Sequence, residues 1–255
     1  MRIGASRTRP GPLRTYAGQV SEPSRTWIRE GRIDPEAVIG LPGWLDPIVT
    51  CVQNLHSDHL RYAVPTDGEG RHSAVLILFG EGPDPDVLMI QRAARMRAHA
   101  GQPAFPGGAV DADDPDAQAA AVREAMEETG LDSAGVRVFG QLPDLWLSVS
   151  GFVVTPVVAW WETPSDVWAR EPDEVESVTR VRLDDLINPA HRVSVRYPSG
   201  YIGPGFRVND MLVWGFTGGL IDLILEHSGL AQPWNREAMV DLDIVTARDE
   251  ESVTS

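Results

Sequence analysis

Three glutamates in one short stretch have the residue type and the spacing to hold metal ions. Glu124, Glu127 and Glu128 would share one narrow face of an α-helix, because successive side chains turn by about 100°. At about 4 Å and an effective dielectric near 20, each like-charged pair costs roughly 4 kcal/mol, so the cluster requires a cation or protonation. Carboxylate oxygens are hard ligands that favour Mg²⁺ or Mn²⁺ over zinc. We therefore expect a divalent-cation site on these three side chains.

A solvated acidic face is the ordinary interpretation of glutamates on a helix, and the three residues alone would not exclude it. Two neighbouring features weigh against it. The Gly107-Gly108 turn lets backbone carbonyls approach the same cation, and Arg123 can brace an adjacent carboxylate. We expect the Gly108 carbonyl to join the metal ligands, with Gly107 and Arg123 as structural residues.

A helix that ends near Gly130 must carry these glutamates. Asp113 or Asp114 can cap its start, Pro115 suits its first turn, and Gly130 suits its end. The apolar side chains that face away from Glu124, and that should anchor the helix in the core, are Val122 and Met126.

Short β-rich runs flank this helix and indicate a mixed sheet in an α/β domain. The expected strands cover residues 74–79, 87–91, 136–142, 152–161 and 174–183, followed by a helical turn over 184–187. Residues 193–208 are typical of a hairpin, and 210–228 have the spacing of a closing helix. Apolar spacing over 36–62 predicts covering helices interrupted at Pro42 and Pro47. We expect one domain over 36–247 and a frayed tail over 248–255.

The charge distribution separates a basic N-terminal segment from an acidic body. The formal net charge is −15, yet residues 1–32 contain seven Arg and two acidic residues. Residues 1–35, rich in Arg, Ser, Pro and Gly, are expected to form a flexible basic arm. An acidic body repels a phosphate backbone over most of its surface, so nucleic acid is not an expected partner.

Several enzyme classes are excluded by missing residue types. All 22 basic residues are Arg, which removes Schiff-base lysine chemistry and the phosphate-loop lysine. Cys51 is the single cysteine, so an intrachain disulfide and a cysteine-based zinc site are impossible, and a reducing, cytoplasmic location is expected. The chain has no apolar run near the roughly 20 residues of a membrane span, so no membrane association is expected.

Residues 123–131, Arg-Glu-Ala-Met-Glu-Glu-Thr-Gly-Leu, preceded by Gly108, resemble the Nudix box, Gly-x5-Glu-x7-Arg-Glu-U-x-Glu-Glu-x-Gly-U, where U is aliphatic. Two departures occur: fourteen residues instead of thirteen separate Gly108 from Arg123, and the middle Glu is absent, with Asp113 or Asp114 nearby. The resemblance implies a Nudix-type α/β/α sandwich with a mixed sheet, an N-terminal extension and a C-terminal helix. It also implies metal-dependent hydrolysis of a diphosphate bond.

A second segment, residues 88–108, is similar to the signature of the coenzyme A pyrophosphatase branch, Leu-Leu-Thr-x-Arg-(Ser/Ala)-x3-Arg-x3-Gly-x3-Phe-Pro-Gly-Gly. Arg92, Arg97 and Gly101 fall in register, while Met89 and Ile90 depart from it. This resemblance implies CoA or acyl-CoA as substrate, with 3′,5′-ADP and 4′-phosphopantetheine as products. Arg92 and Arg97 can either contact substrate phosphates bidentately or form structural ion pairs.

The catalytic base stays open between Glu124 and Glu174. Glu174 and Glu176 alternate with apolar and small residues on an expected strand, and family members often supply an extra carboxylate from this region. ADP-ribose, NADH or a dinucleotide are alternative substrates, and a non-catalytic nucleotide-binding module is a further alternative that the intact glutamate set argues against. A homodimer is compatible with the sequence.

Overall fold

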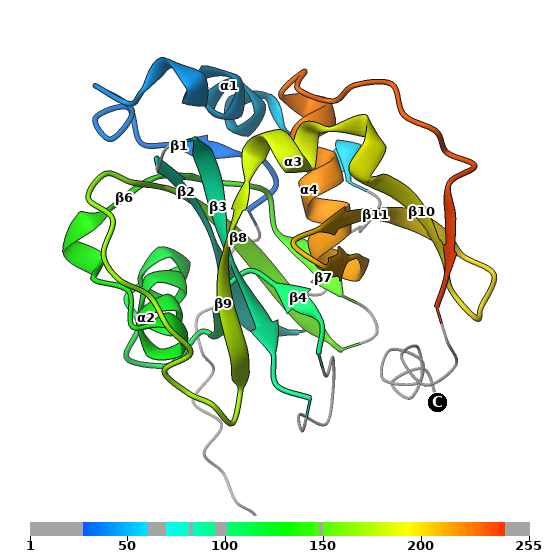
Figure 1. Ribbon diagram of the computed structural model, residues 1–255. Coiled ribbons are helices and arrows are strands. Elements are labelled where there is room, and N and C mark those ends of the chain that lie inside the picture. The colour runs from blue at the N-terminus through cyan, green and yellow to red at the C-terminus, as the bar shows by residue number, and fades with distance from the viewer. Residues whose placement is uncertain (1–27, 61–69, 82–83, 95–100, 148–149, 243–255) are drawn as a thin grey trace, which may run out of the picture.

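The protein has a three-layered α/β arrangement, seen in a computed structural model that describes residues 28–60, 70–81, 84–94, 101–147 and 150–242. Within these residues, helix α2 (Ala117–Thr129) lies against one face of the main sheet. Helices α1 (Asp46–Asn54) and α4 (Gly215–His227) lie on the other side (Figure 1). The expected α/β sandwich with a mixed sheet is confirmed.

The main sheet is mixed, and its central strands β2 and β8 run parallel over ten paired residues. Along the sheet the order is β1-β6-β8-β2-β3-β4, with β5 also on β2, β7 on β8 and β9 on β3. The bounds are β1 Arg32–Ile33, β2 Arg71–Glu81, β3 Pro85–Arg92, β4 Pro103–Ala104, β5 Gly107–Ala109, β6 Val136–Gln141, β7 Leu145–Leu147, β8 Phe152–Trp161 and β9 Val175–Arg182.

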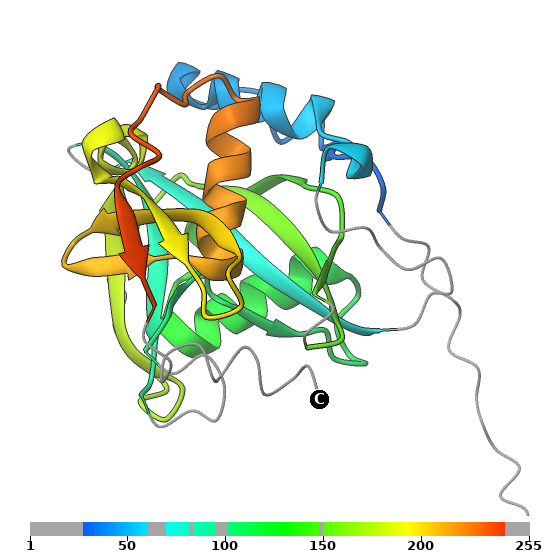
Figure 2. The ribbon, with the colours of Figure 1, turned by 90° about the vertical axis from the view of Figure 1, so that its right-hand side faces the viewer.

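A smaller second sheet lies beside α4 and has the order β12-β11-β10-β13. Its strands are β10 Arg192–Arg196, β11 Ile202–Val208, β12 Met211–Val213 and β13 Met239–Asp241. Figure 2 shows it beside α4, with β13 in red at its edge. Helix α3 (Leu183–Ile187) and 3-10 turns at Gly43–Leu45, Ser57–His59, Ser133–Gly135 and Pro189–His191 complete the described elements.

Strand β2 divides the apolar interior into two cores because its side chains alternate between the faces of the sheet. Leu76 and Leu78 pack with the alanines of α2. Ile77 and Phe79 pack with residues of α1 and α4. The α2 core is thin and the other core is larger, so α2 lies close to the sheet.

Helix α2 forms where the sequence predicts it, but its cap and its buried face differ. The cap is Asp116, whose carboxylate accepts from the Ala119 N–H at 2.9 Å, so the expectation of Asp113 or Asp114 was wrong. Gly130 ends the helix with a φ of 69°, as predicted. The expected anchors Val122 and Met126 are only partly buried, because the helix turns a different stripe toward the sheet. That stripe is Ala121, Ala125, Glu128 and Thr129.

Two further boundaries differ from the predictions. Pro47 lies in the first turn of α1, where a missing N–H costs nothing, so it begins the helix and does not interrupt it. Met211–Val213 forms strand β12 and not the start of the closing helix, which begins at Gly215. In the described residues we find no helix with the length and apolarity needed to cross a membrane.

The segment just before residue 36 belongs to the folded body and not to an arm. Arg32 and Ile33 pair with β6 as strand β1, and the Ile28 N–H donates to Asp144 Oδ2 at 2.8 Å. A two-residue strand has no periodicity to detect, which explains the misplaced boundary at residue 35. Residues 1–27 and 248–255 lie outside the described residues.

Close packing of β1 against α1 gives a test of this docking. The Gly31 N–H donates to Leu55 O at 2.8 Å, and a Cβ at Gly31 would lie 1.8 Å from Val52 O. Gly31→Ala should lower the free energy of unfolding in urea by about 1–3 kcal/mol. The matched control Gly43→Ala, where a Cβ meets nothing closer than 3.9 Å, should change it little. Equal stability of both variants would contradict the docking.

Candidate active site

Two glycines let the backbone of β5 approach its neighbours closely. Strand β5 pairs with β2, placing Gly107 opposite Val75 and Gly108 opposite Ala74. A Cβ at Gly107 would lie 2.3 Å from Ala74 O, and a Cβ at Gly108 would lie 2.4 Å from Glu124 Cδ. Any side chain at Gly108 would therefore displace the Glu124 carboxylate.

The three predicted glutamates lie on α2 in different environments, and two of them, Glu124 and Glu128, contact the glycines of β5. Glu124 covers Gly108 with 18% of its side chain exposed, whereas Glu127 is 47% exposed. Glu128 is only 3% exposed, and its Oε2 accepts from the Gly107 N–H at 2.9 Å. Exposure to solvent therefore decreases from Glu127 to Glu124 to Glu128, and Glu128 connects the helix to the glycine turn by its hydrogen bond.

Arg123 links the other carboxylates through a buried partner, Asp114. Its Nε and Nη2 donate to the two Asp114 oxygens at 3.1 and 2.9 Å. Its Nη1 reaches Glu124 at 3.0 Å and Glu127 at 2.9 Å, and Nη2 also donates to Ala109 O. The hydrogen bonding with Asp114 raises the pKa of the Arg123 guanidinium most, and the hydrogen bond with Glu124 raises it further. One side chain thus fixes Glu124 and Glu127 relative to the loop before the helix.

Arg92 and Glu174 reach the same cluster from the edge of the sheet. The Ala93 N–H donates to Glu174 O at 2.8 Å, just before β9. The charges of both side chains act on Glu128, Arg92 lowering its pKa and Glu174 raising it. Arg92 Nε is buried and donates to no described residue, so it is available to an anionic ligand. Arg97 lies outside the described residues.

Burial leaves Glu128 and Glu124 poorly stabilised as anions. Burial raises the pKa of Glu128 to about 8, against the smaller lowering effects of the Gly107 N–H and Arg92. Burial also raises the pKa of Glu124, which the hydrogen bond from Arg123 opposes. A bound cation would supply the missing stabilisation of both charges.

The donor set fits a hard divalent cation. The Gly108 position admits the Glu124 carboxylate only because a Cβ is absent, and the nearby ligands are carboxylate and carbonyl oxygens. Within the described part of the chain, no three His, Cys, Asp or Glu side chains are already gathered as a metal-binding group. Arg123 instead donates hydrogen bonds to Glu124 and Glu127. To bind a cation, these two carboxylates would give up some of these hydrogen bonds.

Comparison with known proteins agrees with this geometry. The NUDIX domain family model matches residues 70–198, which include the glycine turn, helix α2 and the strands around them. The chain belongs to the Nudix family. It is 40% identical over 164 residues to the uncharacterized Nudix hydrolase NudL of Citrobacter koseri, covering 59% of this chain and 79% of that protein. NudL of Salmonella paratyphi B is 38% identical with the same coverage.

Solved Nudix structures share less of the sequence. The Nudix hydrolase RenU from M. smegmatis is 22% identical, covers 66% of this chain and 91% of its own, and has a TM-score of 0.46. The NUDIX domain of Shewanella oneidensis NrtR, solved in complex with ADP ribose, is 19% identical and covers 46% of this chain and 75% of its own, with a TM-score of 0.38.

Sequence reasoning missed the role of Asp114. It was considered as a helix cap, yet it is the buried partner of Arg123. Its position, six residues after Gly108, is where the Nudix box has its middle Glu, and this spacing could have identified it. The extra residue of this chain therefore lies between Asp114 and Arg123.

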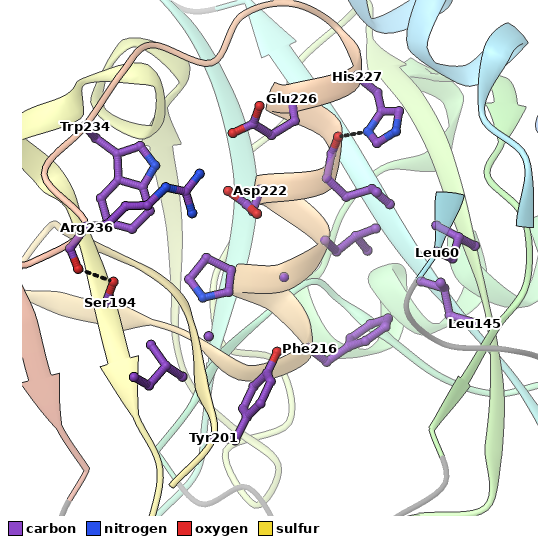
Figure 3. Close-up of a pocket in the computed structure, with 16 residues that line it drawn as sticks. Leu60, Leu145, Ser194, Tyr201, Phe216, Asp222, Glu226, His227, Trp234 and Arg236 are labelled. Carbon is purple, nitrogen blue, oxygen red and sulfur yellow. Dashed lines mark hydrogen bonds between the residues drawn. The ribbon is translucent and has the colours of Figure 1, made fainter. Parts of the chain in front are cut away.

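A separate cavity of about 280 Å³ lies between α4, the β10–β11 hairpin and the segment after α4. Figure 3 shows Asp222 and Glu226 projecting from α4, with Phe216 and Tyr201 at the opposite end. None of the glutamates of α2 lines it. Two of its lining residues, Asp222 and Trp234, contact the buried Arg192, which joins β10 to α4 and to the segment after it.

Loss of Asp114 should loosen the Arg123 network. Asp114→Ala removes two charge-assisted hydrogen bonds, and we expect the free energy of unfolding to fall by about 1–3 kcal/mol, since Arg123 is partly exposed. Asp113→Ala, an exposed neighbour, is the control. Urea unfolding curves check this, and identical midpoints for the two variants would contradict the role of Asp114.

The raised pKa of Glu128 predicts a pH dependence of stability in metal-free protein. Its pKa rises from an ordinary 4.5 to about 8 on folding, so the folded state binds more protons than the unfolded state between these values. Stability should therefore fall as pH rises through this window. In EDTA, the melting temperature of Glu128→Gln should fall less steeply with pH than that of the wild type. Parallel slopes would show that Glu128 does not titrate in this range.

Proposed function

We propose that the chain hydrolyses the diphosphate bond of coenzyme A or an acyl-CoA, releasing 3′,5′-ADP and the corresponding 4′-phosphopantetheine. The observation that supports this proposal best is that residues of the CoA-type signature and of the Nudix box both act on the Glu128 carboxylate. Gly107, from the CoA-type signature, donates to Glu128 of the Nudix box, and Arg92, from the same signature, acts on its charge. Both halves of the sequence resemblance therefore lie at a single site.

Nudix hydrolases generally use divalent metal ions, and we propose Mg²⁺ or Mn²⁺ held by Glu124, Glu127, Glu128 and the Gly108 carbonyl. When bound, the metal supplies neutralisation of the diphosphate charge and a lower pKa for a water molecule. The burial of Glu128 supports this assignment, because burial disfavours its anionic form and a cation would offset that cost.

The remaining roles belong to side chains around the cluster. Arg92, with an uncommitted buried Nε, would bind a phosphate oxygen, and we assign Arg97 the same task from its place in the signature. Glu124 or Glu174 would accept the proton of the attacking water. Glu124 is held by Arg123, while Glu174 is exposed and acts on Glu128 from across the site. The single buried Cys51 fits a reducing, cytoplasmic location.

A substrate panel tests the proposal. Purified protein with Mg²⁺ or Mn²⁺ should show a higher kcat/KM for CoA or acyl-CoA than for ADP-ribose, NADH or nucleoside triphosphates, and EDTA should abolish turnover. Glu127→Gln should lower kcat by orders of magnitude while the fold survives, because Glu127 is half exposed. Glu176→Gln, an exposed glutamate on β9, is the control.

The possible outcomes separate the parts of the proposal. Preference for ADP-ribose or NADH would overturn the CoA assignment and leave the diphosphate hydrolase. Full activity of Glu127→Gln would overturn its assignment as a metal ligand. Binding of these compounds without any turnover would favour a nucleotide-binding module.

A further inference from the structure

A cleft of about 440 Å³ separates the edge of the main sheet from the small second sheet. We call it the β4 cleft. Its main-sheet wall includes Gln91 on β3 and Gln102, which precedes β4, and its other wall includes Asn209 and Leu212 near β12. That second wall lies beyond residues 70–198, the part matched by the Nudix family model. The cleft therefore lies between the part matched by the family model and a segment outside that match.

Backbone hydrogen bonds tie the β4 cleft to the candidate active site. The Arg92 N–H donates to Gln102 O at 3.0 Å, and the Gly101 N–H donates to Arg92 O at 2.9 Å. Gln91 and Arg92 are neighbours at the end of β3, where the pairing with β9 shifts register. Arg92 acts on Glu128, while Gln91 lines the cleft. A substrate bound at Arg92 can therefore extend past the end of β3 toward the cleft.

The described residues that line the cleft disfavour a phosphate group. The described residues that line it include Asp210 and Asp241 and no basic side chain. Arg196 pairs with Asp241 at 3.1 Å, but this leaves Asp210 as an acidic group on the wall. These described acidic side chains would repel an anionic group, so the part of the proposed substrate that fits here is one without a phosphate.

The remaining walls favour a chain that carries amides along an aliphatic backbone. Gln91 and Asn209 carry side-chain amides, and Leu212 offers apolar surface. The bonds of the Gln91 side chain are long, 3.4 Å to Gly101 O and 3.4 Å from Ser177 Oγ. They are weak enough to be exchanged for bonds to a ligand amide.

We propose that the β4 cleft binds the pantetheine arm of the substrate, an uncharged chain with two amide groups, while the diphosphate stays at Arg92. This assignment rests on the proposed CoA function. It makes Gln91 and Leu212 specificity residues and gives the second sheet a part in substrate selection.

The two reaction products separate the arm from the nucleotide and give a direct test. Titration calorimetry should show that Leu212→Trp, which fills the cleft, weakens binding of 4′-phosphopantetheine about tenfold or more, near 1.4 kcal/mol. Binding of 3′,5′-ADP should change less than about twofold, a difference below the energy of one hydrogen bond. Ile202→Trp adds the same ring at an exposed position of β11 outside the cleft and should alter neither affinity.

A smaller change guards against misfolding of the tryptophan variant. Gln91→Leu keeps the side-chain size and removes the amide, and should weaken 4′-phosphopantetheine about fivefold, the effect of one hydrogen bond. Unchanged affinity for 4′-phosphopantetheine in both cleft variants, with CoA still hydrolysed by the wild type, overturns the cleft assignment alone. A wild type that binds no 4′-phosphopantetheine and hydrolyses no CoA overturns the cleft assignment and the CoA function together.

Discussion

The hydrogen bond from the Gly107 N–H to the buried Glu128 carboxylate is the contact on which the site depends. It requires a helix close to the sheet, and the alanine stripe of α2 provides that closeness. It also requires a glycine at position 107, because a Cβ there would lie only 2.3 Å from Ala74 O on β2. Burial of Glu128 then follows, and with it the raised pKa that makes a cation favourable. Local sequence, packing and electrostatics are thus joined in one bond.

Arg123 has the complementary task of holding the solvent side of the cluster. Asp114, which is buried, holds the guanidinium through Nε. The Nη1 atom that donates to Glu124 and Glu127 is therefore fixed in place. An arginine suits this position because its planar donors point in several fixed directions at once. The helix is therefore oriented from both sides, by a backbone N–H at its inner edge and by a guanidinium at its outer edge.

Much of the fold was predictable because its strands and helices carry strong periodic patterns. Strand β8 coincides with its predicted range 152–161, and α2 ends at Gly130 as its αL preference requires. The start of α2 was not predictable, since Asp113, Asp114 and Asp116 are all good caps and only packing selects among them. Strands β1 and β12 are too short to show a period.

The sequence predicts candidate site residues but not the environment of each one. Helical spacing predicted that the three glutamates share one face of the helix, with Val122 and Met126 opposite, but it did not predict their different burial. In the structure the buried face of α2 includes Ala121, Ala125 and Glu128. Glu128 can lie on this face because its carboxylate has a backbone hydrogen-bond partner. No sequence rule gives that arrangement, since it depends on a glycine turn in a different part of the chain.

The two cores on either face of β2 should tolerate substitutions to different extents. On the α2 side, Ala120, Ala121 and Ala125 are fully buried, and an added methyl group there would lift the helix and move its carboxylates with it. On the other side, Ile77 and Phe79 meet larger side chains from α1 and α4, where volume can be exchanged between partners. Substitutions that change stability are therefore expected to accumulate in the larger core. In the thin core the position of the α2 carboxylates limits which substitutions are tolerated.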